Sequence, residues 1–219
     1  MTAAALRVAD APLWVLARRQ TAAKGRRGRV WHMPAGNFAA SLVMRPGDAP
    51  AQLALRSFVA ALALRDALAL HVAALALKWP NDVLLAGDKV AGILLESTGG
   101  ALIIGIGVNL AAAPAPDAVE PGALRPTALA DHGVTVTPED FLTPLAAAFA
   151  QWEARFVRDG FDPIRTAWLA HAARLGEQIT ARTPRDTFTG RFDTVDSAGN
   201  LVLATATGRI TLPAADVHF

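Results

Sequence analysis

The chain has 219 residues, of which 53% are hydrophobic and 18% are charged, and its formal net charge is +2 at pH 7. This composition predicts a globular protein with a sizeable core and excludes an intrinsically disordered chain. Cysteine and tyrosine are both absent, which excludes disulfides, thiolate metal ligands, thiol nucleophiles and phenolic acids or bases. The small net charge by itself gives no reason to expect a nucleic-acid or membrane partner.

The sequence also lacks the usual signals for a membrane or an export pathway. No segment offers 18 consecutive apolar residues, which is the minimum for a transmembrane helix. The first residues do not show the basic, apolar and small-residue segments of a signal peptide in that order. We therefore expect a cytoplasmic protein with no membrane partner.

Short apolar runs and helical patterns alternate along the chain, which predicts an α/β or α+β fold. Strands are expected at 13–17 and 38–44, with a long loop of residues 18–36 between them. Residues 49–70 are rich in alanine and leucine and carry few charges, so we expect a helix that is buried on most sides. Further strands, separated by turn sequences, are expected at 74–79, 83–85, 90–96 and 101–109.

Two helices, followed by a change to short strands, are expected in the second half of the chain. Thr137 is expected to begin one helix, which Gly160 ends. The Asp162-Pro163 pair begins another, with Leu175 on its inward face and Gly176 at its C-terminus. Beyond Gly176 we expect short alternating strands at 179–182, 187–193, 201–204 and 209–212.

This change from helical to alternating sequence patterns predicts a domain boundary near residue 175. Residues 1–175 would form the larger domain, and residues 176–219 would form a small all-β barrel. A barrel of this size is too small to be stable unless it docks on its neighbour.

The loop of residues 18–36, called the basic loop below, carries the densest positive charge. Six of the 21 basic residues fall within twelve positions, namely Arg18, Arg19, Lys24, Arg26, Arg27 and Arg29. Two glycines, Gly25 and Gly28, allow the backbone to approach a ligand, and guanidinium groups present paired donors to phosphate or carboxylate oxygens. We expect an anion to bind here, and a solvated loop or a patch for nucleic-acid phosphate stays open as the alternative.

Three further motifs stand out. Lys78-Trp-Pro-Asn-Asp82 places a lysine at the end of an apolar strand, where it either needs a partner or extends its amine to solvent beside an ordinary turn. Glycines interrupt the apolar strands Lys89-Val-Ala-Gly-Ile-Leu-Leu-Glu96 and Ile104-Gly-Ile-Gly-Val-Asn-Leu110. A glycine inside a strand indicates close approach by a ligand or another backbone, or a tightly packed core.

In this order and spacing, together with Pro34-Ala-Gly-Asn-Phe38 and the small barrel, the motifs resemble those of biotin protein ligases over nearly the whole chain. The resemblance implies an α+β fold. A mixed sheet flanked by helices, like the catalytic domains of class II aminoacyl-tRNA synthetases, would be followed by a Src-homology-3-like barrel. It also implies two reaction steps, in which biotin and ATP, with Mg²⁺, give biotinyl-adenylate and pyrophosphate, and an acceptor lysine then takes the biotinyl group.

The resemblance also implies roles for individual residues. The catalytic residues would be Lys78, Arg26 and Arg29, whose positive charge suits a reaction between a carboxylate and a phosphate. Biotin would contact Thr2, Gln20, Ala23, Lys24, Arg26, Trp31, Lys78, Gly92, Leu94 and Gly105. The nucleotide would contact Lys24, Arg26, Arg27, Arg29, Trp31, Asn81, Lys89 and Asn109. No resident metal site is expected, because the five histidines show no ligand spacing, and no tightly bound prosthetic group is implied.

The partner implied is the biotin carboxyl carrier protein of acetyl-CoA carboxylase or of another biotin-dependent carboxylase. Some family members are also repressors, through a helix-turn-helix that precedes the catalytic domain. No such segment stands here, so DNA binding is not expected. Related enzymes often pair through a sheet edge, which leaves a homodimer open as an alternative to a monomer.

The sequence departs from the family pattern at two places. Met1-Thr-Ala-Ala-Ala-Leu6 stands where a Ser-Thr-Asn segment should end, so that Thr2 would be its remnant and a polar contact to biotin would be lost. Ala23-Lys24 stands where the family commonly has Gly-Arg, and lysine lacks the paired donors of arginine. Two other functions therefore stay open, a lipoate-ligase-like enzyme and a ligand-binding relative that has lost turnover.

Overall fold

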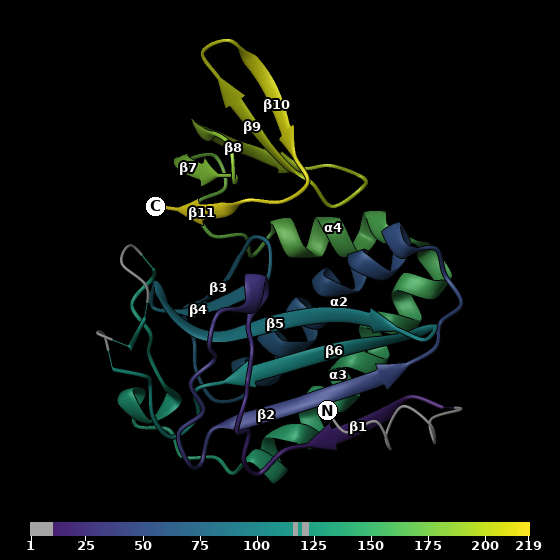
Figure 1. Ribbon diagram of the computed structural model, residues 1–219, viewed down its shortest axis with the longest axis vertical. Coiled ribbons are helices and arrows are strands. Elements are labelled where there is room, and N and C mark those ends of the chain that lie inside the picture. The colour runs from purple at the N-terminus through teal and green to yellow at the C-terminus, as the bar shows by residue number, and fades with distance from the viewer. Residues whose placement is uncertain (1–10, 116–117, 120–122) are drawn as a thin grey trace.

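The computed structural model describes residues 11–115, 118–119 and 123–219 (Figure 1). Within these ranges the strands form a six-stranded and a five-stranded sheet. Helices pack behind the larger sheet, and the smaller sheet stands at one end of the molecule (Figure 1). None of the helices in the described ranges is long and apolar enough to cross a membrane.

The larger sheet confirms the α+β class expected from the sequence. Its order is β1 (Leu13–Leu16), β2 (Phe38–Met44), β6 (Ala101–Val108), β5 (Asp88–Thr98), β4 (Asp82–Leu85) and β3 (Leu75–Lys78). Neighbouring strands in this order are antiparallel. Parallel pairing occurs in isolated bridges, from Leu77 to Ala172 and from Lys89 to Pro126.

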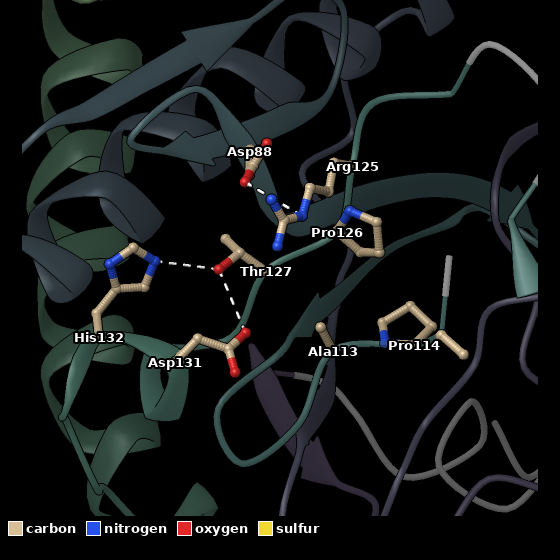
Figure 2. A pocket seen from close by; sticks show the side chains of 9 residues that line it. Asp88, Ala113, Pro114, Arg125, Pro126, Thr127, Asp131 and His132 are labelled. Atoms are coloured by element: carbon tan, nitrogen blue, oxygen red, sulfur yellow. Dashed lines mark hydrogen bonds and ion pairs between the residues drawn. The ribbon is translucent and has the colours of Figure 1, made fainter. Parts of the chain in front are cut away.

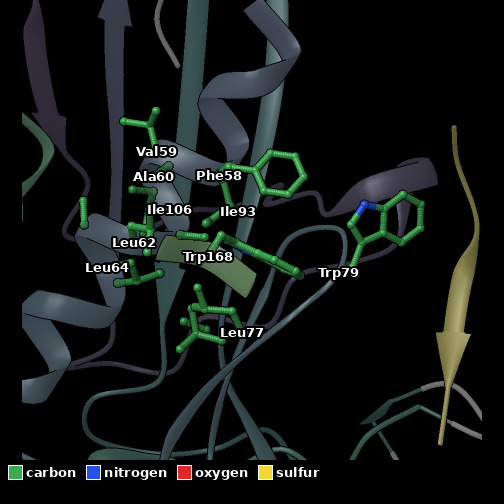
Figure 3. Close-up of a cluster of buried hydrophobic side chains, with 14 of the residues drawn as sticks. Phe58, Val59, Ala60, Leu62, Leu64, Leu77, Trp79, Ile93, Ile106 and Trp168 are labelled. Carbon is green, nitrogen blue, oxygen red and sulfur yellow. The ribbon is translucent and has the colours of Figure 1, made fainter. Parts of the chain in front are cut away.

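Side-chain alternation gives this sheet two different faces. Ile93, Ile104 and Ile106 are almost fully buried in the core against the helices, and Figure 3 shows Ile93 and Ile106 beside Trp168 and Leu62. Because successive side chains in a strand point to opposite faces, the intervening residues of β5 and β6 lie on the other face. Several of those residues are glycines, namely Gly92, Gly105 and Gly107, so this second face has few side chains of its own.

The helix α2 (Pro50–Ala69) is buried on most sides, as its composition predicted. The next helix, α3 (Pro138–Asp159), begins where Thr137 accepts a hydrogen bond from the Asp140 amide at 3.1 Å. The one charged residue buried within α2, Arg56, bonds to carboxylates of Asp48 and Glu153, both at 2.8 Å. These ion pairs connect α2 to α3 and to the loop that precedes α2.

The helix α4 (Phe161–Leu169) ends before the sequence predicted. The backbone leaves the helix to bond with β3, since the Leu77 amide donates to the His171 carbonyl and the Ala173 amide donates to Leu77, both at 2.8 Å. Strand pairing therefore replaces the last helical turn. Leu175, which was expected to face inward, is 39% exposed.

The smaller sheet has the order β10 (Gly208–Leu212), β9 (Leu201–Thr205), β8 (Thr187–Val195), β7 (Gln178–Arg182) and β11 (Asp216–His218), with antiparallel neighbours. It docks on the larger unit, where the Trp79 indole donates to the Gly199 carbonyl at 3.1 Å. The strand β11 was not predicted from the sequence, because three residues are too few for an alternating pattern.

Candidate functional site

The basic loop is folded back on itself. Lys24 and Val30 form an antiparallel bridge, and a 3₁₀ turn, η1 (Arg26–Gly28), closes the end of the loop. Arg27 and Gly28 both adopt left-handed backbone conformations, with φ of 57° and 74°. The loop passes in front of the face of the larger sheet that is opposite the helices, and it runs toward the smaller sheet (Figure 1). Its mobility without ligand stays a prediction.

The Lys78-Asp82 turn holds the second group of charges. Lys78 ends β3 and is only 8% exposed, and its amine lies 3.8 Å from the Asp82 carboxylate. The same carboxylate binds the Lys89 amine at 2.7 Å. Burial lowers the pKa of Lys78, and the charge of Asp82 opposes that shift. The strand-end lysine therefore has the partner that its position demands.

Arg26 connects the two groups of charges. Burial lowers its pKa, while the carboxylates of Asp216 and Asp82 act in the opposite direction. Arg26 also lowers the pKa of Lys78, so the two cations lie within electrostatic reach of each other. The structure therefore brings Arg26 and Lys78 together, and Arg29, the third residue that the family resemblance marked as catalytic, also acts on the pKa of Arg26.

Asp216 is a member of this cluster that sequence reasoning missed. Its Oδ2 atom accepts hydrogen bonds from Arg27 Nη1 and Arg29 Nη2, both at 2.5 Å. Burial alone would raise the pKa of Asp216, but the bond from Arg29 and the charges of Arg29, Arg27 and Arg26 outweigh it and lower the pKa. The carboxylate comes from β11, about 190 residues away from the loop in the chain, so no local pattern could indicate the contact.

The glycines of β5 and β6 allow close approach, as predicted, and the group that approaches is an indole ring. Gly92 and Gly107 are paired in register, and Trp31 covers both of them. A Cβ atom would lie 2.6 Å from the Trp31 ring at Gly107 and 3.3 Å from it at Gly92. The Lys89 amine lies 5.7 Å from the centre of the same ring. The next pair in register on the same face of the sheet is Leu94 and Gly105.

Replacing Gly107 with alanine is expected to displace Trp31 from the sheet, because the added methyl would overlap the indole ring. The emission maximum of tryptophan fluorescence should shift to longer wavelength as the ring enters water. The control is Gly105→Ala, whose Cβ would meet its nearest neighbour at an ordinary 3.6 Å. Equal spectra for the two variants would show that Trp31 does not rest on Gly107.

The remaining predicted residues make other contacts or are exposed. The Asn81 amide donates to the Ile93 carbonyl at 2.6 Å, and the buried Asn109 amide donates to the Thr127 carbonyl at 3.0 Å. Both side chains hold backbone segments in place, and their contacts with a nucleotide stay predictions. Gln20 and Lys24 are exposed and Ala23 is half-buried. Thr2 lies outside the described residues.

Asn37 is a second residue whose role sequence reasoning missed, although it belongs to a quoted motif. It is 3% exposed, and its Oδ1 atom accepts hydrogen bonds from the amides of Ala111 and Ala112 at 2.9 and 3.1 Å. Its Nδ2 atom donates to the Ala112 carbonyl at 2.7 Å. Asn37 therefore fixes the chain just after β6, next to Asn109.

Replacing Asn37 with alanine should lower the free energy of unfolding by about 2 to 4 kcal/mol, because two backbone amides and a carbonyl lose their partners. Urea denaturation measures this change. In Asn37→Asp the acceptor for the two amides remains, but a buried carboxylate oxygen would face the Ala112 carbonyl that Nδ2 now bonds, so a loss at least as large is expected. A loss below about 0.5 kcal/mol in the alanine variant would contradict this role.

A cavity of about 410 Å³ is lined by the segment that follows β6 and by the segment around Thr127 (Figure 2). Its wall includes Thr127, whose hydroxyl lies 3.1 Å from the His132 ring and 3.4 Å from the Asp131 carboxylate. The Thr127 amide donates to the Lys89 carbonyl at 2.9 Å. Asn109 also bonds the Thr127 backbone, but neither Lys89 nor Asn109, which were expected to contact the nucleotide, lines the cavity.

Comparisons with known proteins show what the sequence and the fold are similar to. The biotin/lipoate A/B protein ligase family matches residues 4–111, and the biotin protein ligase C-terminal domain family matches residues 175–219. A Paracoccus denitrificans relative named biotin–[acetyl-CoA-carboxylase] ligase is 56% identical over 215 residues, which are 94% of this chain and 90% of that protein. The bifunctional ligase/repressor BirA of Bacillus subtilis is 33% identical, over 93% of this chain and 65% of its own length.

A solved structure shares the fold. The biotin protein ligase of Aquifex aeolicus, in complex with biotin and ATP, superposes with a TM-score of 0.83 at 24% identity, over 93% of this chain and 87% of that one. Because the Paracoccus denitrificans relative matches over nearly its entire length, and separate ligase families match both parts of the sequence, the chain belongs to the biotin protein ligase family.

Proposed function

We propose that this protein is a ligase that joins biotin to a lysine of a biotin carboxyl carrier protein, through a biotinyl-adenylate made from biotin and ATP. The name of the Paracoccus denitrificans relative supports this reaction and this type of carrier. The observation that carries the proposal is geometric: the Lys78 amine lies 3.8 Å from Asp82 and 5.7 Å from the centre of the Phe219 ring, and Asp216, three residues before Phe219, binds two arginines of the basic loop.

The charge balance of this cluster suits the first step. Two carboxylates, Asp82 and Asp216, face five cations, which leaves a formal excess of three positive charges. The cations are Arg26, Arg27, Arg29, Lys78 and Lys89. Joining biotin to the α-phosphate of ATP brings a carboxylate and a triphosphate together, and fixed positive charge lowers the cost of that approach.

In our proposal the chain divides this work between a strand end and a loop. Lys78 is held at the end of a buried strand and beside Asp82, so its amine is oriented before substrates arrive. In our proposal it donates to the biotin carboxylate and to the oxygen that bridges to phosphorus. Arg26 and Arg29 come from the loop and bind the phosphate oxygens.

The Mg²⁺ ion of the proposed reaction would enter with ATP. The described residues contain no group of three or more histidine, aspartate or glutamate side chains arranged for a metal. Mg²⁺ in nucleotide sites is commonly held by the phosphates with one or two carboxylates, and Asp82 is a carboxylate within the cluster. When bound, the ion would neutralise phosphate charge, and the chain's own contribution would be the cations described above.

Several finer points belong to the same proposal. The remaining biotin and nucleotide contacts are those that the family resemblance implied. The catalytic part would comprise residues 1–175 and the C-terminal domain residues 176–219. We further propose a cytoplasmic enzyme that does not bind DNA, and its assembly as a homodimer is the alternative to a monomer.

The test is transfer of labelled biotin. The protein is incubated with ATP, Mg²⁺, labelled biotin and the carrier domain of a biotin-dependent carboxylase, and labelled carrier is the expected product. A parallel reaction with lipoate and a lipoyl domain tests the lipoate-ligase alternative. Binding of biotin without transfer at any enzyme concentration would contradict the proposal and would instead favour a ligand-binding relative.

A further inference from the structure

The last four residues of the chain meet both cationic elements of the candidate site. Asp216 binds Arg27 and Arg29 of the basic loop through one oxygen atom. Three residues later, the ring of Phe219 lies beneath the Lys78 amine, 5.7 Å from its centre. The smaller sheet thus places a carboxylate and an aromatic ring directly on the groups that must receive substrate anions.

The strand β11 gives Asp216 this direction. Val217 is 6% exposed and packs into the core, so the alternating residues Asp216 and His218 point the other way. The pairing of Asp216 with Arg182 of β7 holds the backbone in register. The carboxylate is therefore presented by a fixed strand, whereas its two arginine partners belong to a loop.

The backbone conformation of Arg27 also indicates that contacts from outside the turn hold the basic loop. Arg27 has a left-handed backbone, with φ 57° and ψ 24°, which is uncommon for a residue other than glycine. Such conformations persist when surrounding contacts impose them. The contact from Asp216 to Arg27, with its second bond to Arg29, fixes the middle of the 3₁₀ turn and the residue that follows it.

We propose that Asp216 is a positioning residue that holds the basic loop as an internal anion and is displaced from Arg27 and Arg29 when the phosphates of ATP bind. The inference deepens the proposed adenylation and rests on it. A triphosphate carries more charge and more acceptor oxygens than one carboxylate, so it outcompetes Asp216 for the same guanidinium groups. Before substrate arrives, Asp216 keeps those groups gathered beside Lys78.

Removing the carboxylate should have two measurable effects. In Asp216→Asn the loop keeps its Lys24–Val30 bridge but loses the bonds to the carboxylate, so trypsin should cleave after Arg27 and Arg29 about two to five times faster, the range expected for a partly exposed charge pair. The KM for ATP in adenylate formation should fall by a similar factor, with kcat within about two-fold, because ATP no longer displaces a competitor. A residue with a merely structural role would raise KM and lower kcat together.

The chain offers a matched control in the same domain. Asp193 is as little exposed as Asp216, and it binds Arg209 at 2.6 Å and Arg191 at 3.5 Å within the smaller sheet. Asp193→Asn should leave both the cleavage rate and the KM for ATP unchanged. Cleavage after Arg18, whose own partner is Glu139, reports the general accessibility of the chain in every variant.

A conservative variant and a ligand complete the experiment. Asp216→Glu keeps the charge and should return cleavage of the loop to near the wild-type rate, and saturating MgATP should protect the loop in all variants. Equal cleavage of the wild type and Asp216→Asn would overturn the proposal, and so would a higher KM with a lower kcat. Proteolysis without ATP needs no catalysis, so it decides the contact with Asp216 even if the proposed ligase reaction fails.

Discussion

Lys78→Met should slow biotinyl-adenylate formation by roughly 10² to 10³-fold, the usual effect of losing one preorganised donor to developing charge. Methionine keeps the length and apolar stem of the lysine, so the end of β3 should remain packed. The isotope exchange between pyrophosphate and ATP, measured with saturating biotin, reports this step directly. A rate within about three-fold of the wild type would remove Lys78 from the mechanism.

The control for this variant is Arg174→Met. The Arg174 guanidinium lies 5.4 Å from the same Phe219 ring that faces Lys78, but it takes no part in the charge cluster described above. This variant should exchange at the wild-type rate. It shows whether the loss of any cation beside Phe219 is enough to change the exchange rate.

The stability of Lys78→Met separates a lost catalytic group from a lost fold. Burial lowers the pKa of Lys78 below its ordinary value of 10.5, so the unfolded chain holds this proton more tightly than the native protein. Between the lowered pKa and 10.5 the contribution of Lys78 to stability therefore rises with pH. The Tm of the wild type minus the Tm of Lys78→Met should therefore increase as the pH rises through this window. A decrease would contradict the direction of the pKa shift.

Arg26→Gly should release the adenylate into solution and make biotinylation indiscriminate. Arg26 is partly desolvated and lies near both Lys78 and the carboxylates of the cluster, where a contact between a charged group and phosphate is worth about 1.5 to 3 kcal/mol. Losing it corresponds to roughly 10 to 100-fold faster release. Labelled biotin should then appear on lysines of an unrelated bystander protein.

Two variants make this result specific. Arg18→Gly removes an arginine of the same loop whose side chain is 90% exposed and 3.6 Å from Glu139, and it should keep labelling confined to the carrier. Arg26→Lys retains the charge without the paired donors, so its selectivity should lie between the wild type and Arg26→Gly. Unchanged selectivity in Arg26→Gly would show that this residue does not retain the intermediate.

Local sequence patterns were sufficient for most of the secondary structure. The strand at 38–44 was predicted with the bounds that the structure shows, and the helix expected at 49–70 runs from Pro50 to Ala69. Both depend on composition and periodicity within one segment. The motifs around Arg26, Lys78 and the strand glycines were equally visible, because each is a short run of residues with a distinctive chemistry.

Tertiary structure alone decided what those motifs contact. Strand pairing ended α4 at Leu169 and exposed Leu175, and packing set Trp31 on Gly107. The bonds from Arg27 and Arg29 to Asp216 join opposite ends of the chain. A residue's neighbours in sequence govern its backbone propensity, whereas contacts across such separations depend on how whole sheets and helices pack. For that reason the chain's chemistry could be inferred from its sequence, and the carboxylate that holds its basic loop could not.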